Sequence, residues 1–514
     1  MSVASEVSTG SGRRATPLRW AWVAALLSGL LLVAAFPPLD FWLVAPVAVA
    51  GLLATLRGRS VRGGALVGLV FGAAFIGALT PWLRVIGPDA WLAVVVLSAL
   101  ALALFGAGAT LLFDLPGWPL WVAAWWATVE TLRSQFPLGG FPWGRLAHSQ
   151  VDAPSVGWVT IGGVPLLGFV VVLTGALLLA VLLAWQRGDR RTAAVAAVAG
   201  IVVYAGASVV SAPTDGRPVR VAVVQGNVPR TGMDAFGQRE AVLTAHLEAT
   251  HRLADDVRAG TVPQPDLVIW PENASDIDPA LDADAYARIT DAVQDVGVPV
   301  LVGMVVEVDG GERVANQGTV WDPETGPGET YVKQNLVPFG EYVPFRSQLQ
   351  PFISRLDRIP RDFVAGDRPG VLDLGAATVA DVICFDVAYD DAVRDAVAGG
   401  GELITVQTNN ATYGRTAQVE QQFAISRLRA IEHGRTVLVA ATSGISGIIA
   451  PDGSVAQQTP EFVAQVLVAE VPARTSQTLA TRFGPAVAWA LTAIGAAAVL
   501  AGAWRRRRAG TLDA

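Results

Sequence analysis

The chain has 514 residues, of which 52% are hydrophobic and 16% charged, and its formal net charge is −7. A mean hydropathy of +0.45 is too high for an ordinary soluble protein, and the length predicts two or more domains. The acidic balance gives no reason to expect nucleic-acid binding, and the one cysteine cannot form a disulfide within the chain.

Eight apolar segments come near the length that crosses a membrane, since a bilayer needs about 20 apolar residues in a helix. Seven of them precede a more polar stretch, and the eighth follows it. The expected spans lie at about 20–35, 40–56, 62–81, 90–113, 116–132, 158–185, 193–211 and 484–504.

These spans divide the chain into five regions. We predict a disordered basic tail, a membrane domain with seven transmembrane helices, a soluble domain, an eighth transmembrane helix and a second basic tail. The five regions cover residues 1–18, 19–211, 212–482, 483–504 and 505–514, in that order.

Arginine clusters predict the orientation, because basic residues collect in cytoplasmic loops. The clusters lie before the first span, between spans two and three, between spans six and seven, and after span eight. With eight crossings, all four fall on one side, so both termini are expected in the cytoplasm and residues 212–482 outside it. The clusters comprise Arg13, Arg14, Arg19, Arg57, Arg59, Arg62, Arg187, Arg190, Arg191 and Arg505–Arg508.

Two loops rich in proline, glycine and aromatic residues are expected on the outer side, at 36–40 and 136–144. Such loops are either ordinary turns at the membrane interface or a floor for a lipid substrate beneath an active site. The sequence alone leaves both interpretations open.

Within residues 212–482, short apolar strands alternate with amphipathic helices, a pattern that predicts a layered α/β domain. Strands are expected at 219–224, 266–270, 298–306, 316–321, 329–333, 379–383, 403–407, 437–441, 446–450 and 466–470. Helices are expected at 240–258, 281–296 and 418–433.

Lys333 is the only lysine in a chain that otherwise uses arginine for positive charge. A lysine ammonium is a compact charge on a flexible stem, whereas the arginine guanidinium is a broad, rigid fork. A compact charge suits a small oxyanion in a tight pocket. The alternative is a surface lysine that remains by chance.

The single cysteine, Cys384, is either a buried apolar side chain or a reactive thiol. The strand at 266–270 supports the second interpretation, because it ends at Pro271 with Glu272 just past it. Glu272, Lys333 and Cys384 each follow a short strand, so all three can gather at one rim of a sheet. There Glu272 would take the thiol proton, Cys384 would attack a carbonyl carbon, and Lys333 would stabilise the negative charge.

Three motifs carry a resemblance to a known family. They are Trp-Pro-Glu at 270–272, Lys-x-x-Leu-Val-Pro-Phe-Gly-Glu-Tyr-Val-Pro at 333–344, and Ile-Cys at 383–384. In these motifs the chain resembles the nitrilase superfamily, specifically the apolipoprotein N-acyltransferase family. The resemblance implies an αββα sandwich as the catalytic domain at 212–482.

The resemblance also implies an activity and its partners. A membrane phospholipid would donate a fatty acyl chain, and the acceptor would be the α-amino group of the diacylglyceryl-cysteine of a lipoprotein. We expect a monomeric, multi-pass protein of the bacterial cell membrane, with its catalytic domain on the extracytoplasmic face. No cofactor, metal or nucleic acid is expected.

Three further residues are expected to support the site. By resemblance, Glu341 is a carboxylate near the cysteine, although a loop hydrogen-bonding role is the alternative. Phe385 and Asp386 stand where the family usually has Tyr-Glu, so an assisting hydrogen bond is expected to be absent or water-mediated.

An apolar, proline-bearing loop follows Glu341 and carries Phe345 and Phe352. We expect one of two roles for it. Either the loop dips into the bilayer and gates the entry of the acyl chain, or it packs on the sandwich.

Three other functions remain open on the sequence alone. A membrane-tethered amide hydrolase of the nitrilase type would use the same three residues with water as the acceptor. A transporter with an outer domain would need no such chemistry, but the spans lack the buried charge pairs that mark substrate paths. A module that only binds lipoproteins would keep working after Cys384→Ala.

Overall fold

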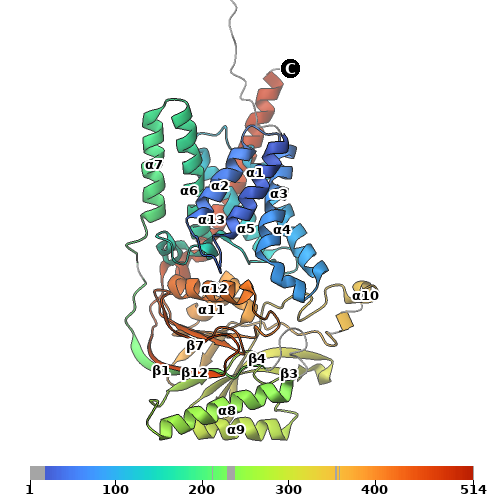
Figure 1. The fold of residues 1–514 in the computed structure, drawn as a ribbon, viewed down its shortest axis with the longest axis vertical. Coiled ribbons are helices and arrows are strands. Elements are labelled where there is room, and N and C mark those ends of the chain that lie inside the picture. Colours follow the sequence, from blue (N-terminus) through green and yellow to red (C-terminus); the bar gives the residue numbers. More distant parts are fainter. Residues whose placement is uncertain (1–17, 211, 229–237, 354–355, 358, 513–514) are drawn as a thin grey trace, which may run out of the picture.

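The computed structural model describes residues 18–210, 212–228, 238–353, 356–357 and 359–512, and it places a helical bundle on a layered α/β domain (Figure 1). The predicted tail at 1–18 therefore lies outside the described residues except for its last residue. The bundle consists of α1 (Leu18–Val33), α2 (Val44–Leu56), α3 (Val61–Leu79), α4 (Pro88–Ala109), α5 (Trp118–Gln135), α6 (Val159–Gln186), α7 (Arg190–Ala205) and α13 (Leu479–Leu512).

Several of these helices have the length and composition of membrane spans. Among the described residues, α3, α4, α6 and α13 are long and apolar enough to cross a bilayer, and α1 and α2 are shorter apolar helices. The chain is therefore a membrane protein. Helix α13 extends beyond the predicted boundary near 504 and continues through Arg505–Arg508.

Glycines let helices α3 and α4 pack at close range. Gly64, Gly68 and Gly72 recur every four residues along one face of α3, and a Cβ atom on Gly68 would lie only 2.1 Å from the carbonyl oxygen of Leu102. Small residues at this spacing allow backbones to approach closely in a membrane, where packing drives helix association. The short 3₁₀ helix η1 (Pro81–Val85) joins these two closely packed helices.

Two six-stranded sheets form the centre of the α/β domain. The first has the order β12-β1-β2-β3-β4-β5 and the second has the order β11-β10-β9-β8-β7-β6. The first comprises β12 (Gln465–Ala473), β1 (Arg217–Gln225), β2 (Leu267–Ile269), β3 (Val300–Val308), β4 (Arg313–Asp322) and β5 (Gly326–Val332). The second comprises β11 (Val455–Gln458), β10 (Gly447–Ile449), β9 (Val437–Ala441), β8 (Leu403–Thr408), β7 (Thr378–Ile383) and β6 (Gly370–Asp373).

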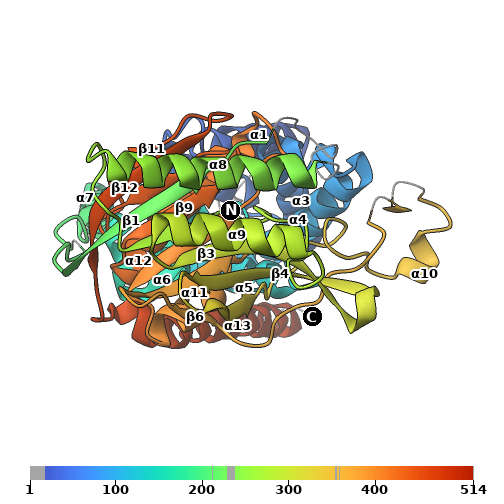
Figure 2. The same ribbon diagram turned by 90° about the horizontal axis from the view of Figure 1, so that it is seen from below.

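The sheets pack face to face over valine, leucine and isoleucine side chains from both, and helices cover the outer faces. Helices α8 (Arg239–Arg258) and α9 (Ala283–Val296) cover the first sheet, on the side away from the bundle (Figure 2). Helices α11 (Asp390–Ala398) and α12 (Ala417–His433) cover the second sheet and lie between it and the bundle (Figure 1). The predicted αββα sandwich is thus confirmed.

A buried ionic network joins the bundle to the sandwich. Arg145, from the segment after α5, lies 2.7 Å from Asp390, which lies 2.9 Å from Arg429 of α12. Arg429 also bonds Glu432, and Glu432 accepts a hydrogen bond from the main-chain N–H of Val164 at a bend in α6. Because buried charges are costly unless paired, this network fixes how the two parts meet.

A single glutamine adds to this junction. Gln421 of α12 accepts hydrogen bonds from the indole N–H groups of Trp82 (3.2 Å) and Trp143 (2.7 Å), which lie in η1 and in the segment after α5. It also donates to the main-chain oxygens of Pro37 and Leu79. Helix α12 is therefore tied to three separate connections of the bundle.

Candidate active site

Glu272, Lys333 and Cys384 lie at strand ends and line one cavity of about 390 Å³, here called the polar cavity. Lys333 and Cys384 directly follow the last residues of β5 and β7, and Glu272 stands three residues after β2. Glu341 lines the same cavity. Residues up to 112 positions apart in the sequence are thus brought together, but from two sheets rather than at the rim of one, because β2 and β5 belong to the first sheet and β7 to the second.

The ammonium group of Lys333 is buried between two carboxylates. Its Nζ atom lies 2.8 Å from Oε1 of Glu341 and 3.4 Å from Oε1 of Glu272, and the side chain is only 1% exposed. Burial disfavours the ammonium form, but Glu341 and Glu272 outweigh it, so the pKa of Lys333 lies well above its ordinary value. Lys333 is therefore a permanent positive charge in the cavity.

Glu272 is held by donors on both of its oxygens. Oε1 accepts hydrogen bonds from Nδ2 of Asn316 (2.6 Å) and from Lys333, and Oε2 accepts one from the main-chain N–H of Asn409 (2.7 Å). Burial raises the pKa of Glu272, Glu341 adds to the rise, and Lys333 and the hydrogen bonds oppose it. A carboxylate whose pKa is raised in this way is suited to take and return a proton.

Glu341 occupies the position of a supporting group. Besides its contact with Lys333, it accepts hydrogen bonds from Nδ2 of Asn316 (3.3 Å) and from the main-chain N–H of Val337 (2.8 Å). Asn316 therefore bridges Glu341 and Glu272 and fixes the distance between the two carboxylates that flank the ammonium group.

Cys384 begins a 3₁₀ helix, η7 (Cys384–Ala388), with a φ angle of +52°. Non-glycine residues rarely adopt this left-handed conformation, and it recurs at functional sites. The turn presents Cys384 to the cavity, while its main-chain oxygen accepts a hydrogen bond from Gln422 (3.1 Å).

The Cys384 thiol is protonated at neutral pH. Burial and Glu272 raise its pKa to about 12, although Lys333 and a hydrogen bond with Thr408 act in the opposite direction. Lys333 therefore favours the thiolate, but burial and Glu272 outweigh its effect. Because the thiolate is the nucleophile, a base must remove the proton as the reaction begins.

Asp386 connects the cysteine turn to the lysine strand. It accepts hydrogen bonds from the Tyr331 hydroxyl (2.8 Å), from both nitrogens of Asn335 (2.8 and 3.0 Å) and from the main-chain N–H of Ile383 (3.3 Å). Tyr331 and Asn335 stand two residues before and after Lys333. Asp386 thus makes direct hydrogen bonds, and one of its donors is a phenol, that of Tyr331; the assisting hydrogen bond expected to be absent or water-mediated stays a prediction.

Phe385 contributes by packing. Its ring stacks on Trp143 (6.2 Å between centroids), lies 6.2 Å from Phe141 and makes an edge contact with Tyr389 (5.3 Å). These rings join the sandwich to the loop after α5.

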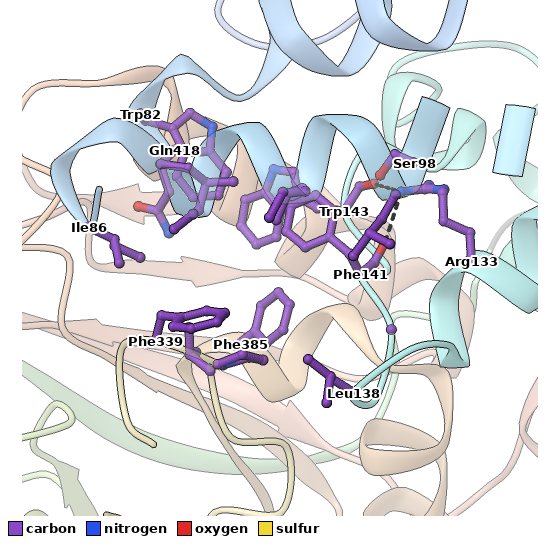
Figure 3. A pocket seen from close by; sticks show the side chains of 18 of the residues that line it. Trp82, Ile86, Ser98, Arg133, Leu138, Phe141, Trp143, Phe339, Phe385 and Gln418 are labelled. Atoms are coloured by element: carbon purple, nitrogen blue, oxygen red, sulfur yellow. Dashed lines mark hydrogen bonds between the residues drawn. The ribbon is translucent and has the colours of Figure 1, made fainter. Parts of the chain in front are cut away.

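A second cavity, of about 130 Å³ and mostly apolar, meets the polar cavity at Cys384; it is here called the apolar cavity. Its walls come from η1, α4 and the loop after α5 on one side and from the sandwich on the other (Figure 3). The figure shows Phe339 and Phe385 below Ile86, Trp82 and Trp143. Cys384 thus stands between a charged space and an apolar one.

The apolar cavity reaches the outer surface of the bundle. Ala93 and Leu97 of α4 line it, and both are exposed on the outer surface of this apolar helix. The loop at 136–144 lines the apolar cavity as well, which agrees with the interpretation of this loop as a floor for a lipid substrate. Arg133 holds the loop by donating hydrogen bonds to the main-chain oxygens of Phe141 and Trp143 (both 2.8 Å). The loop at 36–40 instead lines a separate polar pocket.

The sequence interpretation did not single out several residues that complete the site. Asn316 and Tyr331 lie inside strands, where nothing in the pattern separates them from other polar strand residues. Gln422 lies in a glutamine-rich turn of α12, and only the packing of this helix shows which glutamine faces Cys384. Tyr413 lines both cavities.

Known proteins resemble the two parts of the chain separately and together. Residues 28–177 match the family described as apolipoprotein N-acyltransferase N-terminal domain, and residues 220–481 match the carbon-nitrogen hydrolase family. A protein named apolipoprotein N-acyltransferase from Mycolicibacterium smegmatis is 40% identical over 501 residues, which cover 93% of this chain and 84% of the relative.

Further relatives extend the likeness. A protein of the same name from Pseudomonas paraeruginosa is 31% identical over 474 residues, covering 87% of this chain and 89% of the relative. Among solved structures, an amidase of the nitrilase superfamily from Nesterenkonia has a TM-score of 0.38 at 20% identity, covering 51% of this chain and 93% of the amidase.

Proposed function

Because the chain belongs to the apolipoprotein N-acyltransferase family, we propose that it transfers a fatty acyl chain from a membrane phospholipid, through a thioester on Cys384, to an apolipoprotein. The chain is an acyltransferase that acts in lipoprotein N-acylation, as its relatives' shared name states. The acceptor atom is the α-amino nitrogen of the diacylglyceryl-cysteine.

In the first half of the reaction, Glu272 takes the proton of the Cys384 thiol while the sulfur attacks the ester carbonyl carbon of the phospholipid. The ammonium of Lys333 stabilises the oxyanion that forms. Glu272 then gives the proton to the leaving alkoxide oxygen, so that the lysophospholipid departs as an alcohol and the acyl group remains on sulfur.

In the second half, the amine nitrogen of the acceptor attacks the thioester carbonyl carbon. The C–S bond breaks, and Glu272 passes a proton from the nitrogen to the sulfur of Cys384. The products are an amide and the free thiol. Glu341 keeps Lys333 in place through both halves.

One observation carries this proposal: Cys384 stands where the polar and apolar cavities meet. The apolar cavity offers a place for a fatty acyl chain, and its exposure beside α4 supports entry from the bilayer. The polar cavity holds the groups that the chemistry requires.

The orientation belongs to the same proposal. We infer eight membrane crossings, with both termini in the cytoplasm and the domain at 212–482 on the extracytoplasmic face, because this arrangement places all four arginine clusters on one side. We also infer a monomer, because both cavities are built from one chain.

The decisive experiment combines the full-length protein with phospholipid and a diacylglyceryl-cysteine peptide and measures the mass of enzyme and peptide. We expect an acyl adduct on the enzyme with phospholipid alone, and its transfer when peptide is added. Cys384→Ala should form neither product. Release of free fatty acid without peptide acylation would instead indicate a hydrolase.

A further inference from the structure

A third carboxyl group, that of Asp276, lines the polar cavity together with those of Glu272 and Glu341. It lies four residues after Glu272, in the connection from β2 to α9. Its Oδ1 atom is buried and has no hydrogen-bond partner among the described residues. Arg239 of α8 donates to the main-chain oxygen of Asp276 (3.4 Å) and also lines the cavity. The steps proposed above leave this carboxyl group without a role.

The second half of the reaction releases a proton that Glu272 alone cannot accommodate. An α-amino group has a pKa of about 7.7–8.0, so most of the acceptor is an ammonium ion at neutral pH. This ion must lose one proton before it can attack, and the nitrogen loses another as the amide forms. Glu272 passes one of the two to the sulfur of Cys384, and the other needs a second base.

We propose that the Asp276 carboxylate binds the α-ammonium group of the acceptor and takes its first proton, leaving a neutral amine to attack the thioester on Cys384. This assignment rests on the function proposed above. The step balances: an ammonium ion and a thioester give an amide, a thiol and one proton, which Asp276 holds until it passes to solvent.

The surroundings of Asp276 suit this exchange. Burial raises the pKa of Asp276 to about 7 and Glu272 adds to the rise, whereas Arg239 and a hydrogen bond with Asn273 lower it. A proton moves easily between groups of similar pKa, and the pKa of Asp276 lies close to that of an α-amino group. Once the proton has moved, the neutral carboxyl group no longer holds the amine by charge.

The test measures the two half-reactions separately in the full-length protein with phospholipid and a diacylglyceryl-cysteine peptide. Asp276→Asn should form the acyl-enzyme at the wild-type rate but transfer it to the peptide about tenfold or more slowly at pH 7, with a raised KM for the peptide. The deficit should shrink above about pH 8, where the free peptide loses its own proton. Hydroxylamine, which is uncharged at pH 7, should cleave the thioester equally fast in both proteins.

Asp278→Asn is the matched control. Its carboxylate lies two residues away and accepts hydrogen bonds from the main-chain N–H groups of Ala280 (2.9 Å) and Glu307 (2.8 Å). Asp278 is not among the described residues that line the polar cavity. Both half-reactions should proceed in this variant as in the wild type.

Three results would overturn the assignment. The first is wild-type transfer by Asp276→Asn at pH 7, and the second is an equal slowing at every pH and with hydroxylamine, which would indicate a structural role. The third is slow acyl-enzyme formation in this variant. An absence of acyl-enzyme from the wild type would contradict the proposed function itself, so the enzyme mass separates the two failures.

Discussion

The Nζ atom of Lys333 lies 2.8 Å from Oε1 of Glu341, closer than the 3.4 Å to Oε1 of Glu272. The principal partner of the ammonium is therefore the supporting carboxylate. This leaves the proposed base with a weaker ionic contact, so that Glu272 can exchange a proton without first breaking the main ion pair of the site.

Lys333→Arg should lower the acylation rate of Cys384 by about 100-fold or more, even though the charge is kept. The ammonium is 1% exposed between two carboxylates, and the broader guanidinium cannot enter this space without moving them. The rate of acyl-enzyme formation, followed by intact mass, checks this. Arg288→Lys, at an exposed ion pair with Glu240, is the control and should be neutral. Wild-type turnover in Lys333→Arg would refute the requirement for a compact charge.

Glu272→Gln should block acylation at neutral pH, because the pKa of about 12 keeps the thiol protonated without a base. In the wild type, the rate should fall as the pH drops through the pKa of Glu272, which lies above the usual carboxyl range. In the variant, the residual rate should instead rise about tenfold per pH unit, following the thiolate fraction. Pre-steady-state acylation measured from pH 5 to about pH 10 separates these profiles. Normal acylation of Glu272→Gln at pH 7 would rule out its role as the base.

Tyr331→Phe should reduce kcat by about tenfold, which corresponds to the lower end of the about 1.5–3 kcal/mol that one hydrogen bond to a charged group contributes, because Asp386 keeps its other donors. Asp386→Asn should be more damaging, because the carboxylate joins both sides of Lys333 to the cysteine turn. Steady-state transfer to the peptide checks both variants. Tyr286→Phe, at a tyrosine that is 40% exposed, provides the control. An equal effect of Tyr331→Phe and Tyr286→Phe would contradict this view of Asp386.

Ala93→Trp should lower kcat/KM by about tenfold for long-chain phospholipids and less for short-chain ones, because the indole would occupy the exposed mouth of the apolar cavity. Val96→Trp introduces the same side chain on α4 at a residue that is 46% exposed and is not among the described residues lining the cavity. This control should behave like the wild type. The same loss in both variants, or none in either, would count against an acyl site beside α4.

Tryptophan at Phe352 should be quenched by lipids that carry a quencher at shallow depth, if the apolar loop after Glu341 enters the bilayer. Phe345 and Phe352 are 67% and 86% exposed, and α10 (Arg346–Leu349) projects beside the sandwich (Figure 1). Large apolar side chains left exposed in this way favour a lipid surface as their partner. The absence of quenching at both positions would remove the gate.

The sequence predicted the parts of this protein that depend on local pattern. Apolar runs located the helices of the bundle and ten strands of three to ten residues, even the three-residue β2 and β10, whose residues are all buried. Elements without such a buried apolar run were not predicted: β6 has four residues and ends at an exposed aspartate, β11 is largely exposed, and the nine-residue α11 begins with two aspartates.

The site residues also fall into those that the sequence pattern predicted and those that only the structure reveals. Glu272, Lys333 and Cys384 could be proposed because they are singletons or follow strand ends, and Glu341 because its motif resembles a family. The bridging role of Asn316 depends on the register that pairs Gln317 of β4 with Val332 of β5, which composition does not specify. The apolar cavity draws on segments some 300 residues apart, so only the docking of bundle and sandwich creates it.

The Arg145–Asp390–Arg429 network determines whether the sandwich can be studied without the helical bundle. Arg429 also donates to the main-chain oxygens of Val387 and Ala388, inside the turn that starts at the nucleophile. A truncated sandwich, expressed alone for crystallography or screening, would lose Arg145 and expose Gln421, which accepts hydrogen bonds from two tryptophans of the bundle connections. Inhibitor discovery against this protein therefore calls for the intact chain in lipid, because contacts with the helical bundle help to position the turn that carries Cys384.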